Sequence, residues 1–325
     1  MDLHELSLKE LLSLDLVEIN AGEDNTFYKG AWSVGYRYLY MNMEGYLDGQ
    51  KSVSTAEILK TFAIAQPRMS QEMHLIEASY APTERLSVLL GIPYIMQTTK
   101  HQRRPGANPF VGEEFDVTTD GLSDISAKLA YTVYKAASFQ ILTFAGVGFP
   151  TGSIDETGTV PRGQNQPLPY TMQLGSGTYD LNPGIAYSAQ AGKWSWGTEF
   201  MYKSRLGKND AGYSFGDRYS ATVYLTRRLF DWVAPSIVVT GRSWESISGR
   251  DPRLDPVAKA VPVANPNFYG GDRIDLIFRL NFAIPRGMLK GNRLSVEGGI
   301  PIYQDLNGPQ VQSDYRFGVS WQWTF

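Results

Sequence analysis

The sequence of 325 residues contains no cysteine and only three histidines. Without thiols the chain has no disulfide framework, no thiolate nucleophile and no cysteine-ligated metal site. Charged residues make up 19% of the chain, below the roughly 25% that is usual in soluble domains. The net charge of −3 argues against a nucleic-acid partner. No run of about 18 apolar residues is present, which excludes a helical membrane span.

A signal peptide is also missing from the start of the chain. The opening residues Met1 to Glu5 are acidic and lack the basic region and apolar core of such a peptide. If the protein is exported, we therefore expect this sequence to be a mature or recombinant form.

Aromatic residues are abundant instead, at 13% of the chain, and they alternate with polar residues at its end. From Tyr315 to Phe325 every second position is aromatic or valine, and the positions between are Arg, Gly, Ser, Gln and Thr. Successive side chains of a strand point to opposite faces. In a soluble sheet such an edge would aggregate unless it were covered. The pattern is typical of a membrane barrel strand, apolar toward lipid and polar toward the lumen.

Eleven further segments show the same alternation. With the last, the twelve are residues 30–43, 70–81, 85–98, 121–135, 138–149, 177–189, 193–206, 217–229, 233–246, 271–284, 291–304 and 314–325. Each reaches the 9–11 residues, roughly, that a tilted strand needs to cross a membrane. The connections alternate between short turns and mostly long, Gly- and Pro-rich loops, as in outer-membrane barrels. We predict an all-β fold, a transmembrane antiparallel β-barrel of about twelve strands, with both termini on the short-turn, periplasmic side.

The first residues differ from the rest. Residues 1–25 have a helix-like stripe of leucines, and Ser7 and Glu10 have the spacing of a capping box. We predict a short amphipathic helical leader and linker over 1–25 and a barrel over 26–325. The leader resembles the segment before the plug of some large outer-membrane receptors, so it is expected in the lumen or the periplasm; a frayed helix without a role is the alternative. Loop 44–69 contains a second helical pattern, expected over the mouth or folded inward.

Alternation also predicts which charged side chains face the lumen. These are Arg37, Lys128, Glu199, Lys203, Arg242, Asp275, Arg279, Glu297 and Arg316. An Arg or Lys on the lipid face at mid-membrane costs about 2–4 kcal/mol, so inward placement is expected. Segment 70–81 breaks the rule, because Glu72 and His74 share one face while Met73 and Glu77 share the other. We expect a bulge or an early rim there.

Four of these arginines and two of the carboxylates fall on one wall of the barrel: Arg37, Arg242, Arg279, Arg316, Asp275 and Glu297. One interpretation is a basic, selective constriction that passes anions or acidic solutes. The alternative is a salt-bridge lattice that fills a narrow lumen, since small barrels pack their interiors with side chains.

Catalytic and cofactor motifs are scarce. A barrel phospholipase would carry His and Ser two residues apart on one strand face, but His74 is followed by Leu75 and Ile76. We predict no enzymatic activity and no cofactor.

A soft-metal site is a further hypothesis. Met41, Met43, Met73 and His74, with Met69, lie on two neighbouring predicted strands or the loop between them. Thioether and imidazole ligands suit copper. Methionine also fills irregular apolar surface without any metal, and that is the alternative.

Several local motifs resemble a known family. The segment from Phe149 to Asp155 is similar to its "LPTG" strand exit, and Gly121 to Leu129 to its "GLGDL" strand entry. The segments 77–94 and 179–187 and the aromatic C-terminus fit as well. The family is that of outer-membrane proteins named for a meta-pathway of phenol degradation. The resemblance implies an outer-membrane barrel that moves small, including aromatic, molecules, and it supplies no catalytic residues.

The terminal Phe325 after alternating aromatics resembles the C-terminal signal of bacterial outer-membrane barrels, which implies the barrel-assembly machinery as a partner. We therefore predict a channel or transporter in the Gram-negative outer membrane, in contact with its lipids, for small aromatic or anionic solutes. Two alternatives stay open. One is a copper-related channel or efflux accessory, and the other is a non-conducting structural or interaction barrel blocked by residues 1–25 or loop 44–69.

Overall fold

The computed structural model describes residues 29–106, 113–284, 286–287 and 289–325. The predicted leader helix over 1–25 lies outside the described residues, so the division into a leader and a barrel stays a prediction.

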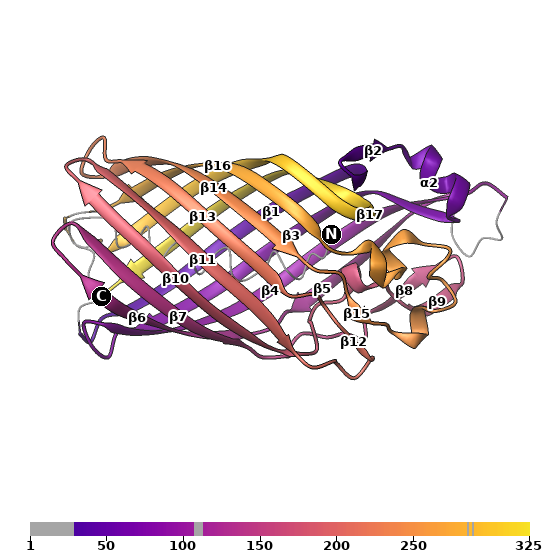
Figure 1. Ribbon diagram of the computed structural model, residues 1–325, viewed down its shortest axis with the longest axis horizontal. Helices are drawn as coiled ribbons and strands as arrows, with labels where there is room; N and C mark the ends of the chain where they lie inside the picture. The colour runs from indigo at the N-terminus through magenta and orange to yellow at the C-terminus, as the bar shows by residue number, and fades with distance from the viewer. Residues whose placement is uncertain (1–28, 107–112, 285, 288) are drawn as a thin grey trace.

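A closed antiparallel β-barrel forms the body of the molecule (Figure 1). In the described part of the chain its ring contains eleven strands, and the last pairs with the first. They are β1 (Trp32–Gly49), β3 (Ile64–Tyr80), β4 (Leu86–Arg103), β6 (Ser126–Lys135), β7 (Phe139–Gly148), β10 (Tyr179–Ala191), β11 (Trp194–Leu206), β13 (Arg218–Arg227), β14 (Val233–Trp244), β16 (Gly271–Ala283) and β17 (Asn292–Thr324).

The element β17 contains two of the predicted segments. Its residues 293–306 pair with β16, and its residues 306–324 pair with β1. Between them Gly308 has a φ of 85°, a left-handed conformation that glycine adopts without a steric penalty. Ser295 Oγ and Ser320 Oγ lie 2.5 Å apart, so the two halves run side by side. The wall is therefore crossed twelve times, which confirms the predicted fold.

The predicted segment 121–135 is divided in the structure. β5 (Glu114–Leu122) and β6 both pair with β4, at different heights. Asp124 lies in the interruption, where its carboxylate accepts hydrogen bonds from Gly152 N at 3.0 Å and Ser176 N at 2.8 Å. The interruption thereby anchors both ends of the long loop between β7 and β10.

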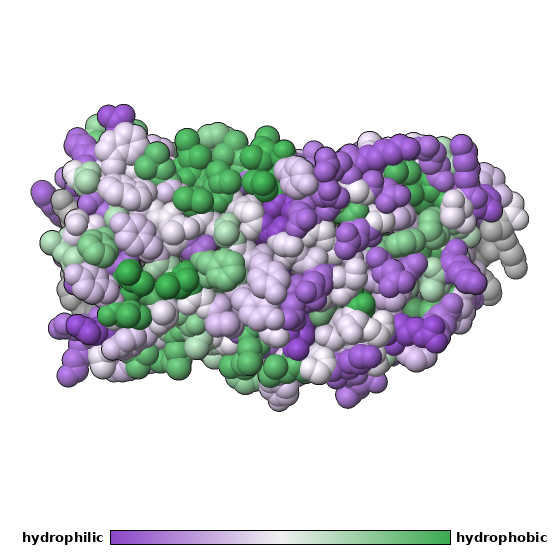
Figure 2. All heavy atoms as spheres, viewed as in Figure 1, coloured by the Kyte–Doolittle hydropathy of each residue, from purple (hydrophilic) through white to green (hydrophobic). Residues whose placement is uncertain are grey.

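The outer wall is apolar over the strands. Trp196, Phe200, Phe278 and Ile300 are all exposed, as their outward register positions predict. Figure 2 shows apolar surface over the strands and hydrophilic surface over the long loops. Within the described ranges, no helix has the length and apolarity that crossing a membrane requires.

The outer face of β3 corrects one expectation. The β1–β3 register runs without a shift from Trp32–Tyr80 to Glu44–Arg68, so the bulge expected in segment 70–81 is wrong. Glu72 and His74 instead stay on the outer face beside tyrosines of β1. Tyr38 Oη donates to Glu72 Oε2 at 3.0 Å, and Tyr36 Oη lies 2.7 Å from His74 Nδ1. Tyrosine hydroxyls thus form hydrogen bonds with the polar side chains of Glu72 and His74 on the outer wall.

The two ends of the barrel differ, as the loop lengths predict: short turns and the C-terminus lie at one end, folded long loops at the other (Figure 1). The loop elements are β2 (Lys51–Val53), α2 (Thr55–Thr61), β8 (Thr157–Val160), β9 (Gly163–Pro167), η2 (Tyr170–Met172), β12 (Tyr213–Ser214), β15 (Ser248–Gly249), η3 (Pro252–Leu254), η4 (Pro262–Ala264) and η5 (Pro266–Phe268). Tyr170, Tyr213, Phe215 and Tyr269 form their buried aromatic core through T-shaped ring contacts. The long loops therefore pack together into one folded cap at this end of the barrel.

Candidate solute pathway through the barrel

The arginine wall is built from β14, β16, β17 and β1, and carboxylates are placed between its guanidinium groups. Glu297 contacts Arg279 Nη2 at 2.7 Å and Arg316 Nη2 at 2.5 Å. Asp275 pairs with Arg242 and, at 3.1 Å, with Arg273 Nε. All of these side chains are buried. The wall therefore has the contacts of a salt-bridge lattice, and a selectivity role for it remains a prediction.

Glycines on neighbouring strands make room for this lattice. A Cβ placed at Gly318 would lie 3.0 Å from Glu297 Cγ, and one at Gly299 would lie 3.2 Å from Arg316 Cγ. The absence of a Cβ at these two glycines therefore leaves space for the Glu297 and Arg316 side chains.

The remaining predicted lumen residues also face inward, Arg37 on β1 of the same wall and Lys128, Glu199 and Lys203 on β6 and β11. Arg37 Nη2 lies 3.7 Å from Glu77 Oε2, and Lys203 Nζ lies 2.8 Å from Asp180 Oδ2. Lys128 and Glu199 are buried, and Lys128 Nζ lies 5.2 Å from the centre of the Phe144 ring. In the structure every predicted lumen side chain therefore lies on the inner face, as the alternation predicts. These side chains do not form a single cluster.

Basic groups outnumber acidic ones inside. Among the described strands, nine basic side chains and four carboxylates are buried. They are Arg37, Arg103, Lys128, Arg205, Arg218, Arg242, Arg273, Arg279 and Arg316, against Asp180, Glu199, Asp275 and Glu297. The whole chain has a net charge of −3, so the positive charge is concentrated on the inner wall.

An apolar belt of buried side chains lies inside the barrel toward the short-turn end, and sequence alternation did not predict it. It consists of Leu89, Ala130, Leu142, Phe144, Ala186, Tyr224, Val238 and Ile277. A Cβ at Gly197 would lie 2.6 Å from the Tyr224 hydroxyl, and one at Gly184 would lie 3.3 Å from Phe144 Cδ2. Inward glycines beside inward aromatics are the only sequence signal for this belt that we identify.

A loop narrows the opposite end, but it is not loop 44–69. Residues 170–176, in the loop between β7 and β10, are buried. Thr119 Oγ1 donates to Met172 O at 3.0 Å, and Gln97 Nε2 donates to Gln173 O at 3.3 Å. Loop 44–69 forms instead the extended ends of β1 and β3 with β2 and α2, so the inward folding allowed for it is wrong; its predicted helix does form.

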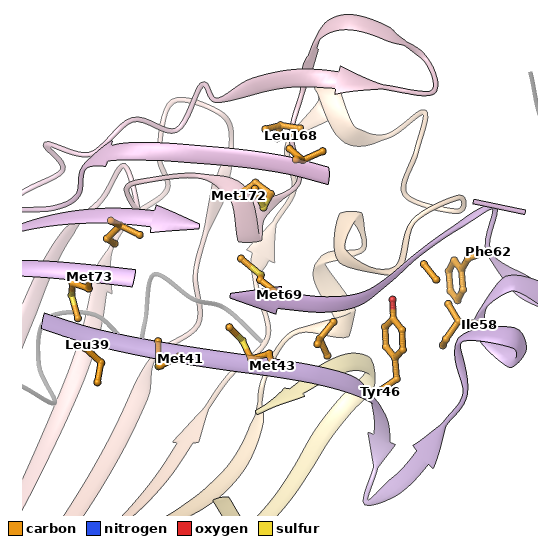
Figure 3. Close-up of a cluster of buried hydrophobic side chains, with 14 of the residues drawn as sticks. Leu39, Met41, Met43, Tyr46, Ile58, Phe62, Met69, Met73, Leu168 and Met172 are labelled. Atoms are coloured by element: carbon orange, nitrogen blue, oxygen red, sulfur yellow. The ribbon is translucent and has the colours of Figure 1, made fainter. Parts of the chain in front are cut away.

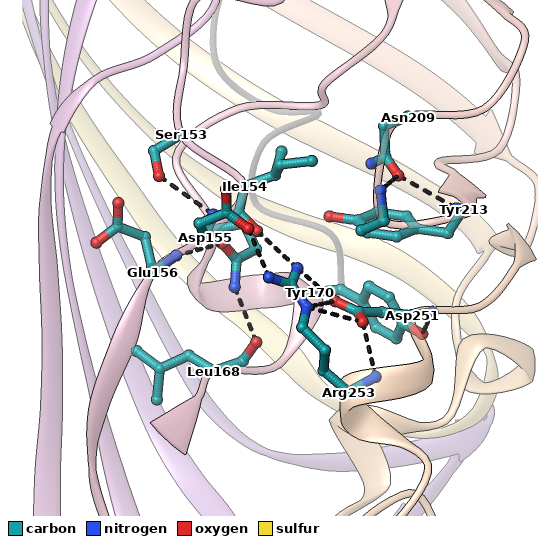
Figure 4. A network of polar contacts seen from close by, with 12 residues as sticks. Ser153, Ile154, Asp155, Glu156, Leu168, Tyr170, Asn209, Tyr213, Asp251 and Arg253 are labelled. Atoms are coloured by element: carbon teal, nitrogen blue, oxygen red, sulfur yellow. Dashed lines mark hydrogen bonds and ion pairs between the residues drawn. The ribbon is translucent and has the colours of Figure 1, made fainter. Parts of the chain in front are cut away.

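A polar network holds the cap together (Figure 4). Arg253 contacts Asp251 at 2.7 Å and Asp155 at 2.5 Å, which joins the β14–β16 loop to the β7–β10 loop. Tyr170 Oη accepts a hydrogen bond from Asp251 N at 3.0 Å. Hydrogen bonding to Asp251 is the main cause that raises the pKa of Arg253. The guanidinium of Arg253 therefore stays charged at every physiological pH.

The predicted metal residues separate into two groups. Met41, Met43, Met69 and Met73 are buried inside the barrel, in one cluster with Met172 (Figure 3). His74 lies on the outer face beside Tyr36. Its inclusion in the metal set is wrong, because neighbouring residues of a strand point to opposite faces.

The sequence of the barrel matches a known protein family. Residues 86–249 match the family described as "Putative MetA-pathway of phenol degradation", which is just over half of the chain. The chain belongs to this family. The resemblance seen in the sequence motifs is thereby confirmed. No curated protein sequence matches the chain.

One solved structure supports the fold of this family member, and two others are more distantly similar. An outer membrane channel from Pseudomonas putida F1 superposes with a TM-score of 0.59 at 14% identity, over 94% of this chain and 99% of that one. The toluene transporter TodX of P. putida gives a TM-score of 0.44 at 10% identity, over 96% and 94%. The β domain of a Bordetella autotransporter gives 0.46 at 9%, over 91% and 100%. The protein is a β-barrel of the bacterial outer membrane. The periplasmic position of its short turns stays a prediction.

Proposed function

We propose that the protein is a passive channel that carries small anionic solutes across the outer membrane. The observation that carries this proposal is the excess of buried basic side chains, nine against four, on the inner wall. A lumen with low-dielectric walls and one sign of charge concentrates the field and favours ions of opposite sign. Anions therefore gain free energy on entering, and cations lose it.

Aromatic carboxylates are the solutes that fit this lumen best. The apolar belt places Phe144 and Tyr224 inside the barrel, and Lys128 lies next to Phe144. Aromatic rings pack well against other rings, while the ammonium group attracts a carboxylate. The belt and the lysine together offer both halves of such a solute a partner.

Uptake into liposomes that contain the full-length barrel tests this function. We expect benzoate to enter faster than benzylammonium, which has a similar shape, by about tenfold, equivalent to about 1.4 kcal/mol. Arg279→Ala with Arg316→Ala should lower this ratio. Arg68→Ala is the control, because Arg68 is exposed and paired with Glu44 at the rim. Equal rates for the two solutes in the wild-type barrel would contradict the anion preference.

A non-conducting barrel is the second candidate, and the buried lattice with residues 170–176 favours it. Both features fill the interior with side chains. The same uptake assay on a variant lacking residues 1–25 separates the candidates. Uptake only after this deletion makes the leader a plug, and no uptake in any variant favours the non-conducting barrel.

The terminal strand supports an interaction with the barrel-assembly machinery. Trp321, Trp323 and Phe325 are exposed on the outer face, and Phe325 closes the barrel through backbone hydrogen bonds of 2.9 Å with Trp32 in both directions. Phe325 therefore contributes to the closure of the barrel, in addition to its resemblance to an assembly signal.

A further inference from the structure

The buried methionines form a group that the proposed channel does not use. Five of the nine methionines in the chain belong to one cluster near the cap: Met41, Met43, Met69, Met73 and Met172. No group of three His, Asp or Glu side chains that could hold a metal occurs in the part of the chain that the structure describes. Thioether sulfurs are therefore the donors to consider in this region.

Strand register brings three of these thioethers together. Met43 on β1 and Met69 on β3 are direct cross-strand partners, and both are buried. Met69 is in turn the partner of Thr99 on β4, whose hydroxyl donates to Met172 Sδ at 3.1 Å. Figure 3 shows the three methionine side chains one above another between β1 and the inserted loop.

A small cavity lies beside this row. Its lining is Met43, Gln66, Met69, Thr99, Thr171, Val263 and Val311. No charged side chain belongs to this lining, and neither Met41 nor Met73 does. Met43 and Met69 therefore lie beside the cavity, and Met172 is joined to them through Thr99, which also lines it. Met41 and Met73 have no such link and lie farther along the strands.

We propose that Met43, Met69 and Met172 bind Cu(I), or another soft monovalent cation. Neutral thioethers select soft metals and bind hard ions such as Na⁺, Mg²⁺ or Ca²⁺ poorly. The Thr99 hydroxyl uses one lone pair of the Met172 sulfur and fixes its direction, and the second lone pair serves the metal. The set differs from the one the sequence suggested, because it omits Met41, Met73 and His74 and adds Met172. The inference is independent of solute transport.

Calorimetric titration of the full-length, detergent-solubilised barrel with Ag⁺, a redox-stable probe for Cu(I), tests this site. We expect one saturable site, and silver X-ray absorption should show sulfur neighbours. Met43→Leu and Met69→Leu should each weaken binding by at least the roughly 10- to 100-fold that loss of an outer-shell partner costs. Leucine conserves volume, so these variants are expected to fold.

Met41→Leu and Met73→Leu are the matched controls, since these methionines are equally buried in the same cluster. These two substitutions should change the affinity for Ag⁺ by less than about threefold, because substitutions outside the site have only small effects on binding. Absence of saturable binding in the wild-type barrel overturns the site. Equal losses in all four variants overturn it too, because they would indicate nonspecific binding to methionine.

Discussion

At the scale of single residues, the interior depends on buried ion pairs that are satisfied together. Glu297 has contacts of 2.7 and 2.5 Å to two guanidinium groups, and each of the three side chains is at most 7% exposed. Removing one member of a buried pair leaves an uncompensated charge, which costs more than the pair contributed. The lattice is therefore sensitive to loss of any carboxylate.

Glu297→Gln should lower the free energy of unfolding by about 3–5 kcal/mol, because two buried arginines lose their common partner. Urea unfolding in detergent micelles, followed by tryptophan fluorescence, measures this. Glu44→Gln is the control, since the Glu44–Arg68 pair is 2.5 Å long but nearly half exposed, and such pairs contribute only about 0–1 kcal/mol. A similar, small loss in both variants would mean that the lattice is solvated.

Residue facing was predictable and residue pairing was not. A period of two places Arg279 and Glu297 on the inner face from sequence alone. Which carboxylate meets which arginine depends on strand register, and alternation does not define register. His74 shows the limit, because its nearness to Met73 in sequence places it on the opposite face in space.

At the scale of elements, the loop between β7 and β10 determines how the mouth is narrowed. Gly152 and Gly175 pack backbone against backbone, and a Cβ at Gly175 would lie 2.2 Å from the Gly152 carbonyl oxygen. Only glycine fits there without a shift of backbone. The docking of residues 170–176 against β4 and β5 depends on this contact.

Gly175→Val should release the loop and raise single-channel conductance severalfold, because residues 170–176 can no longer pack inside the mouth. Planar-bilayer recording measures the change. Gly298→Ala is the control, as a Cβ there meets nothing within 4 Å. Unchanged conductance in Gly175→Val would show that this loop does not limit passage.

The helix α2 has a pH-dependent cap. Glu57 Oε2 accepts hydrogen bonds from Ser54 N and Ser54 Oγ, both 3.1 Å long, and these bonds lower the pKa of Glu57 below 4.5. A folded-state pKa below the unfolded value stabilises the helix above pH 4.5, and this stabilisation is lost as the pH falls through the folded value. Hydrogen exchange of residues 55–62, corrected for its intrinsic pH dependence, should therefore quicken below pH 4.5. Glu57→Gln should abolish this response, because glutamine does not titrate; if the response persists, the Glu57 cap is not its cause.

The helix was predictable and the inserted loop was not. Ser54 and Glu57 form a capping box that is readable in the sequence. The burial of residues 170–176 depends instead on contacts with β4 and β5, far away in sequence, and on the glycine pair that allows them. Long loops with such nonlocal packing leave no periodic signal.

At the scale of the whole molecule, closure of the barrel makes the first and last strands neighbours. Phe325 and Trp32 exchange two backbone hydrogen bonds of 2.9 Å at the short-turn end of the barrel. Deleting Phe325 removes this closing pair and the terminal aromatic residue. We expect less folded barrel in the membrane, measured by heat-dependent mobility in gel electrophoresis, and Leu294→Ala, also on the outer face of β17, is the control. Equal amounts of folded deletion variant and wild type would contradict a role for the last residue in assembly.

The charge distribution of the whole molecule is the basis of the proposed function. Strand alternation predicted a basic interior, although the apolar belt inside it arises from glycine–aromatic contacts that alternation does not describe. The reversal potential of the full-length barrel in a planar bilayer under a KCl gradient tests that function most directly. For the wild-type barrel, the proposed channel predicts a reversal potential whose sign indicates a preference for chloride over potassium. In the double variant Arg279→Ala with Arg316→Ala, this potential should lie closer to zero. A cation-selective potential, or no conductance in any variant, would contradict it.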